Sequence, residues 1–453
     1  MIARLLSEVA AVVGGRVRGE DVTVTSAVSD SRAAVPGALF VALPGERVDG
    51  HDFVREAIAG GAAAALVTRP VPGVPCIEVT DTGAALLALA RDERDRRIDA
   101  TVVGITGANG KTSTKDMTAA VLTTRFRTHA SPASFNTEVG LPVTLLGAAP
   151  DVEVVVAELG ARRVGDVALL CRVARPNLVV VTNVGVAHLE VFGSWEAIVE
   201  ASAEPVEAIA DDGVAILNAD DPVVRGYAER TRARVRWFGL SRDADVRATA
   251  IEIDRDGRAR FVLEVDGEHE PVELAVPGEH MVPNALAAAA VGTTLGVSAA
   301  ECAAALKGAR VSAWRMETFS SPDGVRVVND AYNANPESMA AGLKAARWMA
   351  RDGRLAAVLG HMAELGPIEL DQHERLGELI VRIGVDRLIT VGEPARMIHR
   401  AAVREGQLPE DALDVDTPEA ALEDLRAWLR PGDVVLIKGS RVVELERLAE
   451  ALR

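Results

Sequence analysis

A glycine-rich segment that directly follows an apolar strand constrains this chain more than any other feature. Residues 101–106, TVVGIT, have the continuous apolar character of a buried strand, and residues 107–113, GANGKTS, follow without a break. A strand, a glycine-rich turn and a helix in this order form a P-loop, whose backbone N–H groups bind phosphate oxygens. The nucleotide-binding residues predicted from this loop are Gly107, Ala108, Asn109, Gly110, Lys111, Thr112 and Ser113.

Two side chains of the loop have the chemistry that a magnesium nucleotide needs. The Lys111 ammonium is expected to lie against the β- and γ-phosphates, and the Thr112 hydroxyl is expected to reach Mg²⁺. The segment departs from the common form G-x-x-x-x-G-K-[ST], because Ile105 occupies the position of the first glycine. The alternative is a glycine-rich turn that binds nothing, and GKTS immediately after a strand disfavours it.

Further apolar segments indicate a parallel sheet around the P-loop. Residues 152–159, 177–184 and 214–218 are nearly continuous apolar runs, as strands covered on both faces must be. Helical stretches lie between several of these runs, which is typical of an α/β fold with a parallel sheet.

Two residues at the ends of these strands are predicted to be catalytic and to bind Mg²⁺ together with Thr112. Glu158 stands at the end of the run 152–159, and His188 follows the next buried run. Parallel sheets place their ligands at this edge. A buried carboxylate with a structural role and a hydrogen-bonded core histidine are the alternatives, which the neighbouring P-loop disfavours.

Strand and helix patterns divide the chain into three parts. The first part contains short strands at residues 38–43 and 63–67 and ends in the charged run 91–97, expected to be a solvated helix end that leads into a linker. In the second part, residues 245–275 predict antiparallel hairpins with a turn at Asp256-Gly257. The expected domains are residues 1–98, 99–311 and 312–453.

The third part is predicted to be a second parallel α/β unit, similar in plan to a Rossmann fold. Its apolar segments alternate with helical stretches, as parallel strands joined by crossover helices do. The predicted strands are residues 326–330, 355–360, 387–392 and 433–439.

Charge and cysteine content restrict the partners and the compartment. The net charge of −17 leaves no basic footprint for general nucleic-acid binding, so we expect no nucleic-acid partner. The three cysteines, far apart in the sequence, show neither metal-ligand spacing nor a disulfide framework, which favours a reducing cytoplasm. No run approaches the ~18 apolar residues of a membrane span, so we expect no membrane insertion. Residues 1–15 predict an amphipathic helix ended by Gly14-Gly15 rather than a signal peptide.

Motifs spread over essentially the whole chain resemble those of the Mur ligases of peptidoglycan synthesis. The segments T-G-x-N-G-K-T-S, A-E-L-G and T-N-V-G-x-A-H-L-E-x-F-G-S follow one another between residues 106 and 194. Asp30-Ser31-Arg32 with residues 36–40 and 49–53 look like the UDP-sugar domain of the family. The segments similar to the members that add D-alanyl-D-alanine are NDAYNANP at 329–336, SFN at 134–136, AELG at 363–366 and KGSR at 438–441.

The resemblance implies an α/β protein of three domains and an ATP-dependent amide ligase. An N-terminal α/β domain would bind the UDP-sugar, a central P-loop domain with a parallel sheet would bind ATP and Mg²⁺, and a C-terminal Rossmann-like domain would contact the nucleotide and D-alanyl-D-alanine. ATP would phosphorylate the terminal carboxylate of a UDP-N-acetylmuramoyl tripeptide, and the amine of D-alanyl-D-alanine would attack the acyl phosphate. A cytoplasmic monomer would thus make the pentapeptide precursor of peptidoglycan.

The resemblance also implies roles for single residues outside the P-loop. Asn284 matches a position that contacts adenine, and an N-cap of the following helix is an alternative role that is compatible with it. Arg315 and Asp330 match positions near the phosphates and ribose, beside Tyr332, Asn333 and Asn335. The candidate substrate-binding residues are Ser31, Arg32, Asp49, His51, Asn136, Thr137, Lys438, Ser440 and Arg441.

One departure from the family pattern bears on the metal site and on the function. Most Mur ligases carbamoylate a lysine that helps to hold a second Mg²⁺, and Ser202 stands at that position here. Either Glu200, Glu204 or water substitutes, or the second metal is weaker, or the chain is a paralogue that joins a different amine or acid. Arg162 and Arg163 also stand where Asn-His is frequent. A nucleotide-binding scaffold with impaired ligase activity is the alternative from another class.

Overall fold

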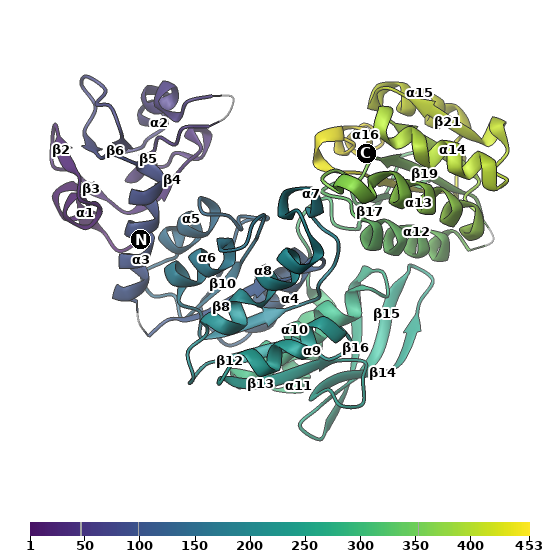
Figure 1. Cartoon of the computed structure of the whole chain (residues 1–453), viewed down its shortest axis with the longest axis horizontal. Helices are drawn as coiled ribbons and strands as arrows, with labels where there is room; N and C mark the ends of the chain where they lie inside the picture. Colours follow the sequence, from purple (N-terminus) through teal and green to yellow (C-terminus); the bar gives the residue numbers. More distant parts are fainter. Residues whose placement is uncertain (46–47, 98, 352) are drawn as a thin grey trace.

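The computed structural model describes residues 1–45, 48–97, 99–351 and 353–453, which form the three lobes of Figure 1. The predicted α/β class is confirmed, because each lobe has a main sheet of mostly parallel strands with helices packed against it. Residue 98, where the first predicted boundary falls, lies outside the described residues.

The N-terminal lobe is built on a sheet with the strand order β2-β7-β6-β5-β4, in which only β2 and β7 pair antiparallel. Its first helix ends at Gly14, which takes the left-handed φ of 64° that glycine tolerates, so the predicted N-terminal helix is confirmed. The elements are β1 Arg4–Leu5, α1 Leu6–Val13, β2 Arg16–Arg18, β3 Thr23–Val24, β4 Ser26–Val28, β5 Ala38–Val41, α2 Val54–Ala59, β6 Ala64–Val67, β7 Cys76–Glu78 and α3 Thr82–Arg96.

The central lobe holds the sheet β16-β15-β14-β13-β12-β11-β8-β10-β9, which is parallel from β9 to β14 and antiparallel beyond. The predicted hairpins are confirmed, with Gly257 in the turn between β14 and β15. The elements are β8 Thr101–Thr106, α4 Lys111–Leu122, β9 Thr128–Ala130, α5 Gly140–Gly147, β10 Val154–Glu158, α6 Asp166–Ala174, β11 Leu178–Val181, α7 Leu189–Phe192, α8 Trp195–Ala208, β12 Val214–Asn218, α9 Pro222–Gly226, β13 Arg234–Gly239, β14 Val246–Ile253, β15 Arg258–Val265, β16 Glu268–Pro277, α10 Met281–Thr294 and α11 Ala299–Gly308.

Both faces of the central parallel strands are covered, as their continuous apolar sequences predict. Val103 and Ile105 of β8 point to the face packed by α4 and α10, whereas Val102 points to the cluster that includes residues of α3, α5 and α6. Side chains alternate along a strand, so one apolar run supplies two cores. The P-loop follows β8 directly, and β8 lies between β10 and β11, which brings their carboxyl ends beside it.

The C-terminal lobe has the strand order β17-β18-β22-β19-β20-β21, parallel except for the edge pair β17 and β18. In the described part of the chain no helix combines the length and the apolar character needed to cross a membrane. The elements are β17 Glu317–Ser320, β18 Arg326–Asn329, α12 Pro336–Ala350, β19 Leu355–Gly360, α13 Glu369–Ile383, β20 Arg387–Val391, α14 Arg396–Glu405, β21 Ala412–Val415, α15 Pro418–Trp428, β22 Val434–Lys438 and α16 Glu446–Ala451.

The charged end of α3 is partly buried, which differs from the expectation. Residues 91–97 do end a helix, but Glu93 and Arg94 are only 1% and 4% exposed, so the expectation of a solvated run is wrong for them. Glu93 pairs with Arg4 and Arg97, and the Arg94 Nε donates to the Ala174 carbonyl at the end of α6 at 2.9 Å. Burial of these charges is tolerable because each has a partner. The charge pattern of one segment does not reveal partners that lie elsewhere in the chain.

Candidate functional site

The P-loop has a backbone conformation that only glycine takes without strain at two positions. Gly107 has a φ of 138°, and a Cβ there would lie 2.0 Å from the Thr182 Oγ1. Gly110 has a φ of 81°, and a Cβ there would lie 2.3 Å from the Asn284 Oδ1. The loop therefore packs closely against two other segments of the central lobe.

The end of β11 fixes this loop through hydrogen bonds that sequence reasoning missed. Asn183 accepts from the Asn109 N–H through its Oδ1 at 2.8 Å and from the Ala108 N–H through its carbonyl at 2.9 Å. The Thr182 hydroxyl donates to the Asn109 carbonyl at 2.7 Å. The sequence signal was the pair Thr-Asn immediately after a buried strand. Polar side chains at this position can form hydrogen bonds with the backbone groups of the neighbouring P-loop.

Two lysines of α4 donate hydrogen bonds from their Nζ groups to backbone carbonyls. The Lys111 Nζ donates to the carbonyl oxygens of Gly107 at 2.6 Å and Ala108 at 3.3 Å, so it lies over its own loop. Burial lowers the pKa of Lys111, and the nearby Glu158 carboxylate opposes this shift. Lys115, one helical turn further and fully buried, was not predicted; its Nζ donates to the carbonyls of Ser131 at 2.7 Å and Ala133.

Thr112 and Glu158 meet at the end of the sheet. The Thr112 hydroxyl donates to the Glu158 Oε2 at 2.9 Å, and the Asn136 Nδ2 donates to the Oε1 at 2.8 Å. The Ser134 hydroxyl lies 3.0 Å from that of Thr112. Hydroxyl and carboxylate oxygens are the hard ligands that Mg²⁺ prefers, so these residues fit a magnesium ion bound with phosphates. Ser113, beside Thr112, is buried.

His188 faces the C-terminal lobe rather than Glu158. Its Nδ1 pairs with the carboxylate of Glu364, which also pairs with Arg162. Burial lowers the pKa of His188, while Glu364 raises it and the charges of Lys111 and Arg162 lower it. In the described residues no group of three or more histidine, cysteine, aspartate or glutamate side chains could hold a metal ion.

The predicted nucleotide residues of the C-terminal lobe come next to the P-loop. The Arg315 guanidinium carbon lies 4.1 Å from the centroid of the Tyr332 ring, and its NH2 donates to the Thr112 hydroxyl at 3.3 Å. The Asn335 Nδ2 donates to the Asn109 Oδ1 at 2.7 Å. These contacts bring two predicted C-terminal residues onto the predicted loop, as a nucleotide bound between lobes requires.

Asp330 and Asn333 engage a lysine that was predicted to bind substrate. The Lys438 Nζ donates to the Asp330 Oδ2 at 2.6 Å and to the Asn333 carbonyl at 2.9 Å. Burial lowers the pKa of Lys438, and Asp330 opposes this shift. Lys438 therefore orders the segment after β18, next to Tyr332 and Asn335, in this structure.

Asn284 lies inside a helix and not at its start. His280 occupies the N-cap position of α10, so the N-cap role proposed for Asn284 is wrong. Asn284 is 6% exposed, and its Oδ1 accepts from the Thr114 hydroxyl at 3.3 Å. It thus links α10 to α4 directly behind Gly110.

The other predicted substrate residues lie in separate places. The Ser440 hydroxyl accepts from the Ala363 N–H at 2.9 Å, and the Arg441 guanidinium carbon lies 4.4 Å from the centroid of the Trp314 ring. Thr137, exposed, accepts from the Gly140 N–H at 3.4 Å at the start of α5.

In the N-terminal lobe the predicted residues form three local pairs. The Arg32 NH2 donates to Asp30 at 2.6 Å and the neighbouring Ser31 hydroxyl donates to the Glu56 carboxylate, while the Asp49 Oδ1 lies 2.7 Å from the His51 Nδ1. Hydrogen bonds from His51 and Arg69 hold the pKa of the Asp49 carboxyl well below its usual range. Within the described ranges no hydrogen bond or ion pair joins Ser31, Arg32, Asp49 or His51 to the P-loop.

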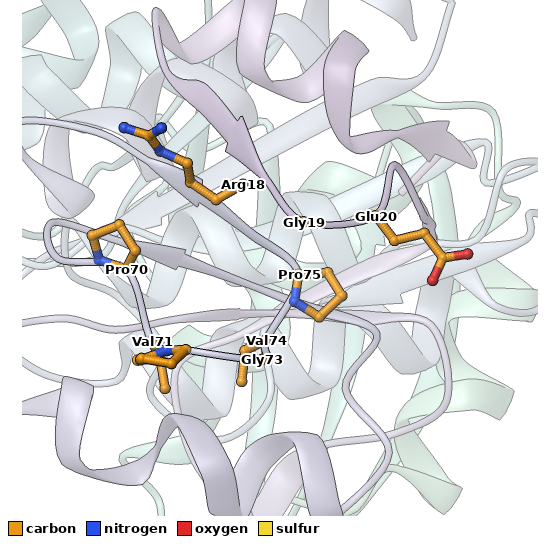
Figure 2. A pocket seen from close by; sticks show the side chains of 9 residues that line it. Arg18, Gly19, Glu20, Pro70, Val71, Gly73, Val74 and Pro75 are labelled. Carbon is orange, nitrogen blue, oxygen red and sulfur yellow. The ribbon is translucent and has the colours of Figure 1, made fainter.

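An open depression of about 560 Å³ lies elsewhere on the N-terminal lobe (Figure 2). It is lined by Arg18, Gly19, Glu20 and residues 70–75, a segment rich in proline. None of the predicted site residues lines it, and its two charged side chains form no cluster with chemistry of its own.

Comparison with known proteins identifies the family. Over its whole length the chain is 42% identical to the UDP-N-acetylmuramoyl-tripeptide--D-alanyl-D-alanine ligase of Mycobacterium tuberculosis, covering 98% of that protein. This chain belongs to the Mur ligase family. Residues 23–93 match the Mur ligase family catalytic domain, residues 105–292 the Mur ligase middle domain and residues 314–441 the glutamate ligase domain of Mur ligases. The predicted family and three-domain fold are confirmed.

More distant relatives and solved structures agree with this result. This Mur ligase is 33% identical to the enzyme of the same name from Bacillus subtilis, with 100% of the chain and 99% of that protein covered. A crystal structure of MurF from Acinetobacter baumannii superposes with a TM-score of 0.86 at 29% identity, over 98% of both chains. MurF of Thermotoga maritima in complex with ADP superposes with a TM-score of 0.80 at 31% identity, over 94% of this chain and 96% of that one.

Proposed function

We propose that this Mur ligase joins D-alanyl-D-alanine to a UDP-N-acetylmuramoyl tripeptide at the expense of ATP. One observation carries the assignment: relatives of that activity match the chain from end to end, at up to 42% identity. The P-loop with Thr112 against Glu158 supplies the site at which ATP would react. The products are the UDP-muramoyl pentapeptide, ADP and phosphate.

The proposed reaction needs positive charge at the point where the tripeptide carboxylate approaches the γ-phosphate. When the tripeptide carboxylate attacks the γ-phosphate, negative charges approach one another, so cations at the site act most strongly in the transition state. Lys111 is held over the loop by two carbonyl oxygens and needs little reorganisation to contact a phosphate. Mg²⁺ held by Thr112 and Glu158 would supply further charge neutralisation.

We propose that the three lobes are domains with separate functions, formed by residues 1–98, 99–311 and 312–453. The first would bind the UDP-sugar through Ser31, Arg32, Asp49 and His51. The second would hold ATP and Mg²⁺, and the third would add nucleotide contacts and the D-alanyl-D-alanine site. We propose a cytoplasmic monomer without a nucleic-acid partner. The net charge of −17 argues against general nucleic-acid binding, and the buried free cysteines suit a reducing compartment.

Product analysis with purified chain tests this function. ATP, Mg²⁺, UDP-muramoyl tripeptide and D-alanyl-D-alanine together are expected to release ADP and phosphate, and mass spectrometry is expected to show the pentapeptide. Omitting either organic substrate should stop phosphate release. Lys111→Ala is expected to lose ligation by a factor on the order of 10²–10³. Lys307→Ala, an exposed lysine on α11, is the matched control and should keep full activity.

The alternative functions correspond to different outcomes of the same assay. Release of ADP with diaminopimelate or another amine in place of D-alanyl-D-alanine would identify a paralogue with a different acceptor. Nucleotide binding without release of phosphate under any substrate combination would identify a scaffold. Full ligation by the Lys111→Ala variant would contradict the mechanism.

A further inference from the structure

The contact between the central and C-terminal lobes includes a carboxylate that pairs with two side chains of the central lobe. Glu364 follows β19 and pairs with Arg162, which follows β10, and with His188, which follows β11. The Glu190 N–H of α7 also donates to the Glu364 carbonyl at 3.0 Å. Figure 1 places α7 where the central lobe meets the C-terminal lobe. Main chain and side chain therefore both join the lobes at this position.

The backbone at both ends of the His188–Glu364 pair is strained. His188 has a φ of 58° and Glu364 a φ of 62°, in the left-handed region that residues with a Cβ seldom adopt. Such conformations are energetically unfavourable and cluster at functional sites. The arrangement of His188 and Glu364 is thus imposed by the fold and is not a chance contact of two mobile surface side chains.

The residues around Ser202 do not fit the second metal site of the family pattern. A serine hydroxyl forms no stable carbamate, and Ser202 lies beside Tyr227, whose hydroxyl donates to the Val199 carbonyl at 2.7 Å. The two nearby carboxylates are engaged elsewhere: Glu200 pairs with Arg230 at 2.9 Å, and Glu204 accepts from the Ala168 N–H at 2.7 Å. Neither is free to replace the missing carbamate.

We propose that the Arg162 guanidinium takes the place of the second Mg²⁺ in this chain, positioned by Glu364, which is itself held by His188. This inference rests on the proposed function. A divalent cation held by one carbamate leaves a single net positive charge, and a guanidinium carries the same charge. Its planar fork also matches two phosphate oxygens, which a point charge does not. The Arg162 side chain is 60% exposed, and its NH2 group is the one that pairs with Glu364, so its other N–H groups can bind a substrate phosphate while that pair is kept.

The step that Arg162 would assist is transfer of the γ-phosphoryl group. A tripeptide carboxylate oxygen forms a bond to the γ-phosphorus while the bond from that phosphorus to the bridging oxygen breaks, and ADP leaves with the electron pair. No oxidant or further reactant is needed. Arg162 would bind the oxygens of the phosphoryl group during this transfer, on the His188 side of the site, with Lys111 on the P-loop side.

Counting metal ions tests the proposal without turnover. The full chain is titrated with Mn²⁺ in the presence of UDP-muramoyl tripeptide and a non-hydrolysable ATP analogue, with free Mn²⁺ measured by electron paramagnetic resonance. We expect one bound ion per chain, and no change on adding bicarbonate. Two bound ions would overturn the proposal. Ligation of D-alanyl-D-alanine by the wild-type chain is measured separately, so failure of the proposed function is visible in that assay and failure of this inference in the metal count.

Kinetics of variants at Arg162 provide the second test. Arg162→Asn is expected to lower kcat by a factor on the order of 10²–10³ with a smaller change in the KM for ATP, because the charge acts in the transition state. Arg162→Lys should recover part of the loss. Arg163→Asn is the matched control, because Arg163 is also exposed and its side chain forms no ion pair within the described residues. Equal kcat values for the Arg162→Asn and Arg163→Asn chains, both with wild-type melting temperatures, would overturn the assignment.

Discussion

At the scale of single residues, the loop glycines set what the site can accommodate. Gly107 combines a φ of 138° with a position at which a Cβ would lie 2.0 Å from the Thr182 hydroxyl. Relief of that clash would move β11 away from the loop, or move the loop away from the hydrogen bonds of Asn183. Loop geometry, and with it the direction of the N–H groups toward phosphate, depends on the absence of a side chain here.

Gly107→Ala is therefore expected to weaken ADP binding more than tenfold and to destabilise the fold by about 1–3 kcal/mol, since it adds backbone strain to a clash. Isothermal titration with Mg·ADP and thermal unfolding measure the two effects. Gly226→Ala is the control, because Gly226 has a φ of −64° and nothing lies within 4 Å of a Cβ there. Wild-type ADP affinity in the Gly107→Ala chain would refute this account of the loop.

Residue roles could be predicted from sequence where they depend on a local motif. Lys111 and Thr112 belong to one continuous segment with Gly107 and Gly110, so their chemistry is readable in order along the chain. The partners that fix the loop, such as Asn183, are far away in sequence and close only because β11 pairs with β8. The N-cap role assigned to Asn284 was wrong for a different reason: the first residue of a helix cannot be located from propensity alone.

At the scale of secondary-structure elements, the central strands were predictable and the short edge strands were not. Continuous apolar runs indicated β8, β10, β11 and β12, because strands buried on both faces are apolar along most of their length. In contrast, the edge strand β9 has only the three residues THA, which carry no periodic signal. Short or polar sequence is how natural sheets keep edges from pairing with other chains, so edges are the hardest strands to predict.

The helix α3 yields a prediction of its own. Arg94 donates to the Ala174 carbonyl, to the Arg175 carbonyl and to the Asn177 Oδ1, so it satisfies the end of α6 from another lobe. Arg94→Met is expected to lower the free energy of unfolding by about 2–3 kcal/mol, because buried carbonyls lose their donor. Arg96→Met, which removes an exposed i,i+4 pair with Asp92, should cost less than about 1 kcal/mol. Urea titration distinguishes the two, and equal costs would mean that Arg94 does not carry the lobe contact.

At the scale of the whole molecule, the net charge of −17 describes the surface but not the site. Lys111, Arg315 and Arg162 concentrate positive charge beside one sheet edge, where a polyanionic substrate would bind. Composition excluded a broad basic surface, and it carried no information on how lobes meet. Contacts such as Asn335 with Asn109 depend on the placement of one lobe against another, which follows from three-dimensional packing and not from any segment.

A second contact between the lobes involves the β14–β15 turn and gives the last prediction. The Trp348 Nε1 donates to the Asp254 carbonyl, and the Arg326 NH2 donates to the Asp256 Oδ1, both at 2.9 Å. Other contacts, such as Asn335 with Asn109, still join these lobes, so loss of both bonds should loosen the C-terminal lobe at this turn without unfolding it.

The double variant Trp348→Phe, Arg326→Met is thus expected to increase the radius of gyration of the ligand-free chain in small-angle X-ray scattering, with a change of about 1 kcal/mol or less in stability. Mg·ADP with UDP-muramoyl tripeptide should restore the compact value, because the substrates bridge the lobes. Arg260→Met is the control: it also removes one arginine, but this arginine lies on β15 and pairs with Glu273 inside the central lobe. If that control expands the chain as much as the double variant does, the contact at the turn does not hold the lobes together.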